Sequence, residues 1–421
     1  MRDRADSERV VITGVGLVSP IGIGRDEAWA SALAGRSGAG PITRFDSSDM
    51  QVRIACEVTD FVPEDFMDRR AVRRNDRFTQ MAVAAGHLAL ADARLEIDGD
   101  GRRAGAVVAS GVGGAETRES SHERMLREGP DRVPPMTVPA TVANMAAAQL
   151  SMTFGLRGPV WCQHVACAAG TQAIGDAAEI VRRGDADVML AGGAEAGITR
   201  FWIAGFDAMR VLSRWNDEPE RAARPFDVAR NGFLLGEAAC VVVLEPLDRA
   251  RRRGAPIVAE IAGYGLTADA HHITDPDPDG DGLAAAIEEA LRDAGAGPQD
   301  VGHVNAHGGA SQPGDPAEVL AIGKALGEDV AAGVPVSSTK AIHGHALAAT
   351  GAVEAALTAF AVQDQQLPPT ANLEDVDPAC AGVDHVVGAA RPAAVGTALS
   401  LSSGLGGHNA VLAISRPPDH D

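Results

Sequence analysis

The stretch GPVWCQHVACAAGTQAIGDAAEIVRRGDADVMLAGGAE, at residues 158–195, carries the clearest sign of how the chain folds. A strand-like run precedes Cys167, and between residues 174 and 181 apolar side chains recur at spacings of three and four, as on one face of a helix. Gly184 ends this helix, and the run ADVMLAGG at residues 186–193 follows as a strand. The stretch therefore predicts a strand, a helix and a second strand, with Cys167 at the start of the helix.

Similar β-branched runs alternate with alanine-rich helical stretches along the rest of the chain, which predicts an α/β protein with a parallel sheet. Before the basic turn at residues 249–254 the runs are VVITGVG, AGAVVASG, ADVMLAGG and ACVVVLEP; after it they are PIVAEIAGYG, VGHVNAHG and TALSLSSG. We therefore predict two α/β halves, residues 1–255 and 256–421. VVITGVG and AEIAGYG resemble each other too faintly to establish a duplication.

Composition and charge narrow the class of protein. With 57 acidic and 37 basic side chains among 421 residues, the formal net charge of −20 argues against a nucleic-acid partner. Five scattered cysteines without CxxC pairs argue against a disulfide framework or a metal site. Residues 1–8 are charged and lack the apolar core of a signal peptide, which predicts a cytoplasmic protein. The weakly charged stretch at 341–362 is interpreted as a buried helix, not a membrane span, because it carries His343, His345 and Glu354.

Cys167 is the candidate nucleophile. At a helix N-terminus the free N–H groups and the positive end of the helix dipole favour thiolate over thiol. The small residues Ala168, Ala169 and Gly170 leave room for a substrate. The other four cysteines lack such neighbours and are interpreted as packing residues.

Two further segments supply the partners that such a cysteine needs. NAHGGASQPGDPAE places His307 at a strand end before a glycine-rich loop, and VSSTKAIHGHALAATGAVEAA contains Lys340 and His345. Neutral imidazoles can donate hydrogen bonds to a developing enolate or oxyanion. Lys340 could anchor the histidines, with Glu354 as its ionic partner.

Three glycine-containing or acidic loops complete the motif survey. The double-glycine turn in SLSSGLGGHNAVLAI, at residues 400–414, suits a backbone N–H placed beside the nucleophile. GVGLVSPIG lacks both the GxGxxG fingerprint and a P-loop lysine, so no nucleotide cofactor is predicted. DPDPDGD at residues 275–281 lacks the closing glutamate of an EF-hand and is interpreted as a solvated loop.

Taken in order, these motifs resemble those of the β-ketoacyl-acyl-carrier-protein synthases, the elongating condensing enzymes of the thiolase superfamily. The resemblance covers nearly the whole chain and rests on Cys167 in VACAAG, His307 in NAHG, Lys340 in SSTK, His345 in GH and the GLGG turn. It implies a thiolase-like αβαβα fold of five layers with two similar α/β halves, assembled as a homodimer. A heterodimer with a related subunit is a second arrangement that the resemblance allows.

The resemblance also implies a decarboxylative Claisen condensation. Cys167 would take an acyl group from a carrier-protein thioester, and His307 with His345 would promote loss of CO2 from malonyl carrier protein. The resulting enolate attacks the acyl-cysteine. Lys340, with its glutamate partner, would organise the histidines, and the backbone N–H groups of Cys167 and Leu405 would form the oxyanion hole. Both substrates arrive on the phosphopantetheine arm of acyl carrier protein, so the enzyme needs no cofactor or metal of its own.

The resemblance also implies a set of substrate-binding residues: Val112, Thr137, Phe206, Phe233, Gly309, Ser311, Ser403 and Leu405. Phe233 matches a family phenylalanine, and Val112 and Phe206 keep an apolar lining, but other positions depart from the common family pattern. Gly309 and Ser311 stand in a loop where the family usually has Thr-Ser-Thr, and Leu405 stands in a turn that is commonly aromatic. Thr137 replaces a phenylalanine that often closes the acyl pocket across the dimer interface. Because each lost ring opens volume, we expect an acyl substrate that is bulkier, more polar or more unsaturated than a saturated chain.

An acidic enzyme needs a local basic patch to dock an acidic carrier protein. In MDRRAVRRNDRF, residues 67–78, the side chains of Arg70, Arg73 and Arg74 resemble the family's docking residues, and Arg210 matches another. A solvated helix face is the alternative interpretation.

Three other functions compete with specialised polyketide or unusual fatty-acyl synthesis. A housekeeping elongating synthase of fatty-acid synthesis would use the same active site. A silent chain-length-determining subunit would lack the active cysteine, and Cys167, His307 and Lys340 argue against it. A degradative thiolase acting on coenzyme A esters would need a second catalytic cysteine. Chain length, unsaturation and pathway product stay open.

Overall fold

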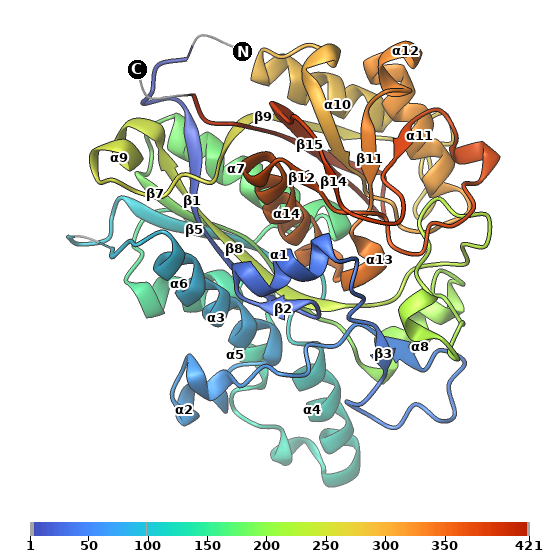
Figure 1. Ribbon diagram of the computed structural model, residues 1–421. Coiled ribbons are helices and arrows are strands. Elements are labelled where there is room, and N and C mark those ends of the chain that lie inside the picture. Colours follow the sequence, from blue (N-terminus) through green and yellow to red (C-terminus); the bar gives the residue numbers. More distant parts are fainter. Residues whose placement is uncertain (1–3, 98, 419–421) are drawn as a thin grey trace.

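The computed structural model describes residues 4–97 and 99–418, which form two halves with one shared strand order (Figure 1). In the first half the order is β6 (Val160–Trp161), β5 (Ala104–Ala109), β7 (Val188–Ala196), β8 (Glu237–Pro246) and β1 (Val10–Ser19). In the second it is β11 (Pro335–Ser337), β10 (Val301–Asn305), β15 (Thr397–Gly404), β16 (His408–Ser415) and β9 (Ala259–Ala268), with β13 (Asp384–His385) outside β11. The two sheets join where β1 pairs with β9.

Strand directions also repeat between the halves, and they correct the expectation of a parallel sheet. β5 is parallel to β6 and β7, whereas β8 is antiparallel to β7 and β1. In the same way β10 is parallel to β11 and β15, whereas β16 is antiparallel to β15 and β9. β15 and β16 are joined by a hairpin turn that is too short to connect parallel strands. The sheet is therefore mixed.

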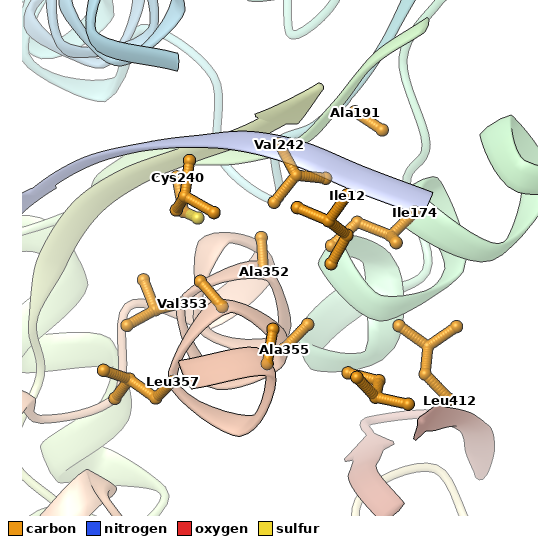
Figure 2. Packing of buried hydrophobic residues seen from close by; sticks show 14 of the residues in the cluster. Ile12, Ile174, Ala191, Cys240, Val242, Ala352, Val353, Ala355, Leu357 and Leu412 are labelled. Carbon is orange, nitrogen blue, oxygen red and sulfur yellow. The ribbon is translucent and has the colours of Figure 1, made fainter. Parts of the chain in front are cut away.

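Helices form three layers around the two sheets, giving five layers in all. α7 (Ala169–Arg182) and α14 (Thr350–Asp364) lie between the sheets and contact both of them. α3 (Arg77–Asp92) with α6 (Met145–Phe154) covers the outer face of the first sheet, and α10 (Asp281–Ala294) with α11 (Gly314–Leu326) covers the second. Figure 2 shows the core around α14, where Ala352 and Ala355 lie between Val242 of β8 and Leu412 of β16.

The remaining elements are short or peripheral. The helices are α1 (Arg25–Leu33), α2 (Arg69–Val72), α4 (Ala115–Glu128), α5 (Thr137–Thr141), α8 (Arg200–Ala208), α9 (Leu247–Arg252), α12 (Glu328–Ala331) and α13 (Lys340–His343). The strands are β2 (Gly22–Ile23), β3 (Gly40–Pro41), β4 (Ile54–Ala55), β12 (Gln366–Leu367) and β14 (Arg391–Pro392).

The prediction for α7 is confirmed, and the prediction of a buried helix at 341–362 is confirmed in part. In α7, Ile174, Ala177 and Val181 are buried, and Gly184 adopts a left-handed φ of 74° just beyond the helix, as its position predicted. The stretch at 341–362 is buried but forms a continuous helix only from Thr350, because Gly344 breaks it with a φ of 69°. Within the described residues, no helix is long and apolar enough to cross a membrane.

Paired glycines let one helix pack directly on one strand in each half. A Cβ at Gly16 of β1 would lie 1.8 Å from the carbonyl oxygen of Ala85 in α3. A Cβ at Gly265 of β9 would lie 2.1 Å from that of Ala286 in α10. These glycines are part of the faint likeness between VVITGVG and AEIAGYG. The shared motif therefore reflects close packing of a helix on a strand, and this packing occurs in both halves.

We predict that Gly16→Ala and Gly265→Ala each lower the free energy of unfolding by about 2–3 kcal/mol, because the added methyl group overpacks a backbone contact. Gly323→Ala on α11 is the control. No heavy atom lies within 4 Å of a Cβ there, so we expect a gain of about 0.5–1 kcal/mol. Urea unfolding followed by circular dichroism measures all three variants. Equal midpoints for the variants would contradict the packing argument.

Candidate active site

Cys167 lies at the N-terminal end of the central helix α7. Residues Ala166–Ala168 form a single 3-10 turn that continues into the helix, and the thiol is partly exposed in a cavity. Ala166 adopts a φ of 50°, a left-handed conformation that costs about 1–2 kcal/mol in a residue with a side chain. Such strain is typical of residues that a fold holds in place for function.

Two backbone N–H groups, that of Cys167 itself and that of Leu405, face the Cys167 sulfur and lower the pKa of the thiol. Leu405 belongs to the turn between β15 and β16, so the second half of the chain supplies one of the two donors. A Cβ at Gly404 would lie 3.0 Å from the Cys167 nitrogen, which is a tight contact, so glycine favours the close approach of this segment. Paired N–H groups of this kind can stabilise an oxyanion.

The electrostatic surroundings of Cys167 differ from the sequence-based expectation of a thiolate. Burial raises the pKa of the Cys167 thiol to about 11, although the Lys340 ammonium and the N–H of Leu405 lower it. Removal of water outweighs the donors at the helix end. The sulfur is therefore a thiol in the free protein near neutral pH, and it must lose its proton as it reacts.

His307 and His345 line the same cavity as this sulfur. Their rings are nearly perpendicular, with centroids 5.5 Å apart, and the ring of Phe233 packs 5.0 Å from that of His345. Burial lowers the pKa of both histidines well below the usual value, and the Lys340 ammonium lowers each further. Both rings are therefore neutral near pH 7.

Hydrogen bonds to the Nδ1 atoms leave both Nε2 atoms available to a substrate. The backbone N–H of Ser403 donates to Nδ1 of His307 at 3.3 Å, so the neutral ring carries its proton on Nε2. Nδ1 of His345 lies 2.9 Å from the hydroxyl of Thr350. An N–H donor on Nε2 suits the stabilisation of a negative oxygen.

Lys340 and Glu354 form a buried ion pair behind the histidines. The ammonium donates to Glu354 Oε1 at 2.6 Å and also to the carbonyl oxygen of His307. Burial raises the pKa of Glu354 to about 7, and the ammonium opposes that rise. The pair fixes the backbone that carries His307.

Two further carboxylates hold the loop after His307, and motif reasoning did not single them out. Glu318 accepts hydrogen bonds from the backbone N–H groups of His307 at 2.5 Å and Gly308 at 2.7 Å. Asp315 accepts from Ser311 at 3.1 Å. The only signal in the sequence is the pair of acidic residues in the NAHGGASQPGDPAE segment, which reads equally well as a solvated helix start.

A third buried carboxylate, Glu195 of β7, also went unnoticed. It accepts hydrogen bonds from the hydroxyl of Ser110 and the backbone N–H groups of Gly111 and Val112. Burial raises its pKa to about 7. Glu195 thereby holds the turn after β5 that forms one wall of the cavity.

The cavity that contains Cys167 measures about 460 Å³ and brings together most of the expected pocket residues. Those that line it are Val112, Phe206, Phe233, Gly309, Ser311, Ser403 and Leu405. Thr137 does not line it: the residue lies on α5, where its hydroxyl is 2.9 Å from that of Ser121. Its expected position against the pocket of a second copy stays a prediction.

The expected docking arginines are exposed. Arg70 lies on α2 and Arg73 and Arg74 follow it, while Arg210 adopts a φ of 59° between two cavity-lining residues. Their role stays a prediction. Among the described residues, no group of three or more histidine, cysteine or acidic side chains could hold a metal ion.

Two family models match the chain. The N-terminal domain of β-ketoacyl synthase matches residues 7–250, and the C-terminal domain matches residues 258–374. The chain is 46% identical over 413 residues to 3-oxoacyl-[acyl-carrier-protein] synthase 2 of Staphylococcus aureus (strain N315), covering 98% of this chain and 99% of the relative.

Solved structures give the same result. The chain superimposes on the ishigamide ketosynthase/chain length factor with a TM-score of 0.91 and 35% identity, covering 97% of this chain and 99% of the other. It also superimposes on AntDE:AntF, a type II polyketide synthase acyl-carrier protein in complex with its ketosynthase bound to the hexaketide. There the TM-score is 0.87 and the identity 32%, with the same coverage of each chain.

Proposed function

Because the chain belongs to the β-ketoacyl synthase family and is an acyltransferase of thiolase-like fold, we propose that it catalyses a decarboxylative Claisen condensation. An acyl group held on Cys167 is joined to the two-carbon unit of malonyl carrier protein. One observation carries the proposal: a cysteine, two backbone N–H donors and two neutral histidines converge in one cavity.

In the first step the Cys167 sulfur attacks the thioester carbonyl of an acyl carrier protein. The carbonyl oxygen becomes negative and accepts hydrogen bonds from the N–H groups of Cys167 and Leu405. The bond from the carbonyl carbon to the phosphopantetheine sulfur then breaks. That sulfur leaves as a thiol with the proton from Cys167, and the acyl group stays on the enzyme.

In the second step malonyl carrier protein enters with its thioester oxygen beside Nε2 of His307 and His345. The bond between the α-carbon and the carboxylate breaks, CO2 leaves, and the electron pair forms an enolate that the two N–H donors stabilise. The enolate carbon forms a bond to the carbonyl carbon of the acyl-cysteine, and the bond from that carbon to the Cys167 sulfur breaks. The sulfur leaves as a thiolate and takes up a proton from water, which restores the thiol. These steps use side chains, backbone N–H groups and the leaving carboxylate, with both substrates carried on phosphopantetheine.

We predict that substitutions of Cys167 and His307 differ in their effect on the release of CO2 from malonyl carrier protein. Cys167→Ala abolishes condensation but still releases CO2, because the enolate donors remain. His307→Ala lowers CO2 release by about 100-fold or more, because it removes a donor to the developing charge. A coupled assay measures the release of CO2, and mass spectrometry of the carrier measures condensation. His122→Ala, at an exposed position, is the control. Loss of condensation with unchanged CO2 release in both variants would contradict the assigned roles.

The proposed partners are an acyl carrier protein and a second copy of the chain, or a related subunit in its place. AntDE:AntF contains a ketosynthase with its acyl-carrier protein, which supports the first. The exposed Arg70, Arg73, Arg74 and Arg210 are the proposed docking residues. A cytoplasmic location stays a prediction from the sequence.

We expect Arg70→Glu combined with Arg74→Glu to raise the KM for acyl carrier protein about tenfold and to change kcat less than about twofold, because docking precedes chemistry. Steady-state kinetics at two salt concentrations measure the effect, which high salt should reduce. Arg102→Glu combined with Arg292→Glu, at two exposed arginines outside α2, is the matched double charge reversal. An equal rise in KM for that variant would show that net charge alone is responsible.

We further propose that the acyl substrate is specialised. Supporting observations are the cavity of about 460 Å³ and the absence of aromatic side chains at Ser403 and Leu405, which both line it. The alternative, a housekeeping elongating synthase, is favoured by the 46% identity to 3-oxoacyl-[acyl-carrier-protein] synthase 2.

Acyl transfer to Cys167 distinguishes the two pathways. We expect a polyunsaturated eight-carbon chain to be transferred from its carrier about tenfold faster than the saturated chain, because the widened cavity accepts a rigid substrate. Intact-protein mass spectrometry under single-turnover conditions gives both rates. Equal or faster transfer of the saturated chain would favour the housekeeping function.

A further inference from the structure

Two apolar side chains from different halves of the chain converge in the cavity wall. Val112 lies on the turn after β5, and Leu347 lies between His345 and α14. Both line the cavity that contains Cys167. A Cβ at Gly197 would lie 3.7 Å from Cγ2 of Val112 and 3.6 Å from Cδ1 of Leu347. The two side chains therefore meet beside Gly197 and form one stretch of wall.

The backbone at Leu347 is strained and must be held by its surroundings. Its φ of 45° lies in the left-handed region, which is unfavourable for a residue with a side chain. A Cβ at Gly193 of β7 would lie 2.7 Å from the carbonyl oxygen of Ala348, so the segment that contains Leu347 packs directly on β7. Glu195 lies two residues further along β7, so its side chain is on the same face of the sheet as that position.

The carboxylate of Glu195 contacts both parts of this wall. It is fully buried, and it accepts hydrogen bonds from the N–H of Gly111 at 2.6 Å and the N–H of Val112 at 3.1 Å. The hydroxyl of Ser110 donates to it at 3.1 Å. On the other side the N–H of Ala348 faces the carboxylate and lowers its pKa. One side chain thus joins the turn after β5 to the strained segment before α14.

An ionised carboxylate suits this position better than a neutral acceptor would. Burial raises the pKa of Glu195 to about 7, whereas the donors of the wall lower it. Hydrogen bonds to an ionised acceptor are stronger than those to a neutral one. A glutamine at this position would keep one acceptor oxygen but turn an N–H group toward the N–H donors. One part of the wall would then lose its contact.

We propose that Glu195 is a positioning residue for acyl transfer, whose carboxylate holds Val112 and Leu347 together as one wall against the acyl chain. The inference rests on the proposed function, because it names the residue that shapes the cavity for the chain held on Cys167. An acyl chain that reaches the wall depends on Glu195, whereas a very short one does not.

The catalytic histidines are anchored by other groups. The N–H of His345 donates to the carbonyl oxygen of Leu234 at 2.8 Å, and the carbonyl oxygen of His345 accepts from the N–H of Gly236 at 3.0 Å. Glu318 holds the loop of the other histidine. We therefore expect the loss of Glu195 to slow the transfer of long acyl chains and to leave the release of CO2 from malonyl carrier protein nearly unchanged.

The test compares the transfer of acetyl and octanoyl groups from carrier protein to Cys167, followed by intact-protein mass spectrometry under single-turnover conditions. An acetyl group has one carbon beyond the carbonyl and needs little of the wall. Glu195→Gln should lower the ratio of octanoyl to acetyl transfer rates about tenfold, as expected when one or two hydrogen bonds that hold the wall are lost. The release of CO2 should change less than about twofold.

Matched variants separate positioning from a general loss of stability. Ser110→Ala removes one of the donors to the carboxylate and should lower the same ratio about threefold, which keeps the test available if Glu195→Gln does not fold. Glu260→Gln is the control, because Glu260 of β9 is also buried but pairs with Arg9 away from the cavity. Hydrogen exchange at residues 110–112 and 347–349 should become faster in Glu195→Gln and not in the control.

The outcomes are distinguishable. An unchanged ratio in Glu195→Gln and Ser110→Ala, or an equal slowing of acetyl transfer, octanoyl transfer and CO2 release, would overturn the inference and leave the proposed function intact. The same fall of the ratio in Glu260→Gln would also overturn it. Failure of the wild type to acylate Cys167 from any carrier would overturn the proposed function and the inference with it.

Discussion

The active site depends on direct backbone contact between the N-terminal ends of α7 and α14. A Cβ at Gly170 would lie 2.5 Å from the carbonyl oxygen of Ala348, and one at Gly351 would lie 2.1 Å from the hydroxyl oxygen of Thr171. Larger residues at these positions would push the central helices apart. Because Cys167 precedes one helix and His345 precedes the other, this contact brings the nucleophile of the first half to the histidines of the second.

One buried cation organises the electrostatics of that junction. The Lys340 ammonium lowers the pKa of Cys167, His307 and His345, and it is the ionic partner of Glu354. Burial acts in the same direction on the histidines but in the opposite direction on the thiol. The result is two neutral imidazoles in the same cavity as a protonated sulfur, which suits a reaction whose negative charge develops on the substrate.

Local patterns in the sequence predicted the strands and the start of α7. They also singled out Cys167, His307, Lys340 and His345, because each lies at a strand or helix end with a distinctive motif, and the chemical roles of these residues stay predictions. They did not predict the antiparallel directions of β8 and β16, which follow from long-range connections. They also missed Glu195 and Glu318, since an acidic residue becomes a buried acceptor only when distant N–H groups converge on it. The protonated state of Cys167 likewise depends on the water that the folded chain excludes. The faint likeness between VVITGVG and AEIAGYG became informative only when both glycine pairs were seen to touch helices.

The hairpin between β15 and β16 serves both reacting groups at once. The N–H of Ser403 fixes the proton of His307 on Nε2, and the N–H of Leu405, two residues later, reaches the sulfur of Cys167. A displacement of this turn would therefore remove both the hydrogen bond that sets the tautomer of His307 and the N–H group that faces the Cys167 sulfur. Acyl transfer and decarboxylation therefore both depend on the position of this one turn. The insertion of one residue in the turn would slow both half-reactions.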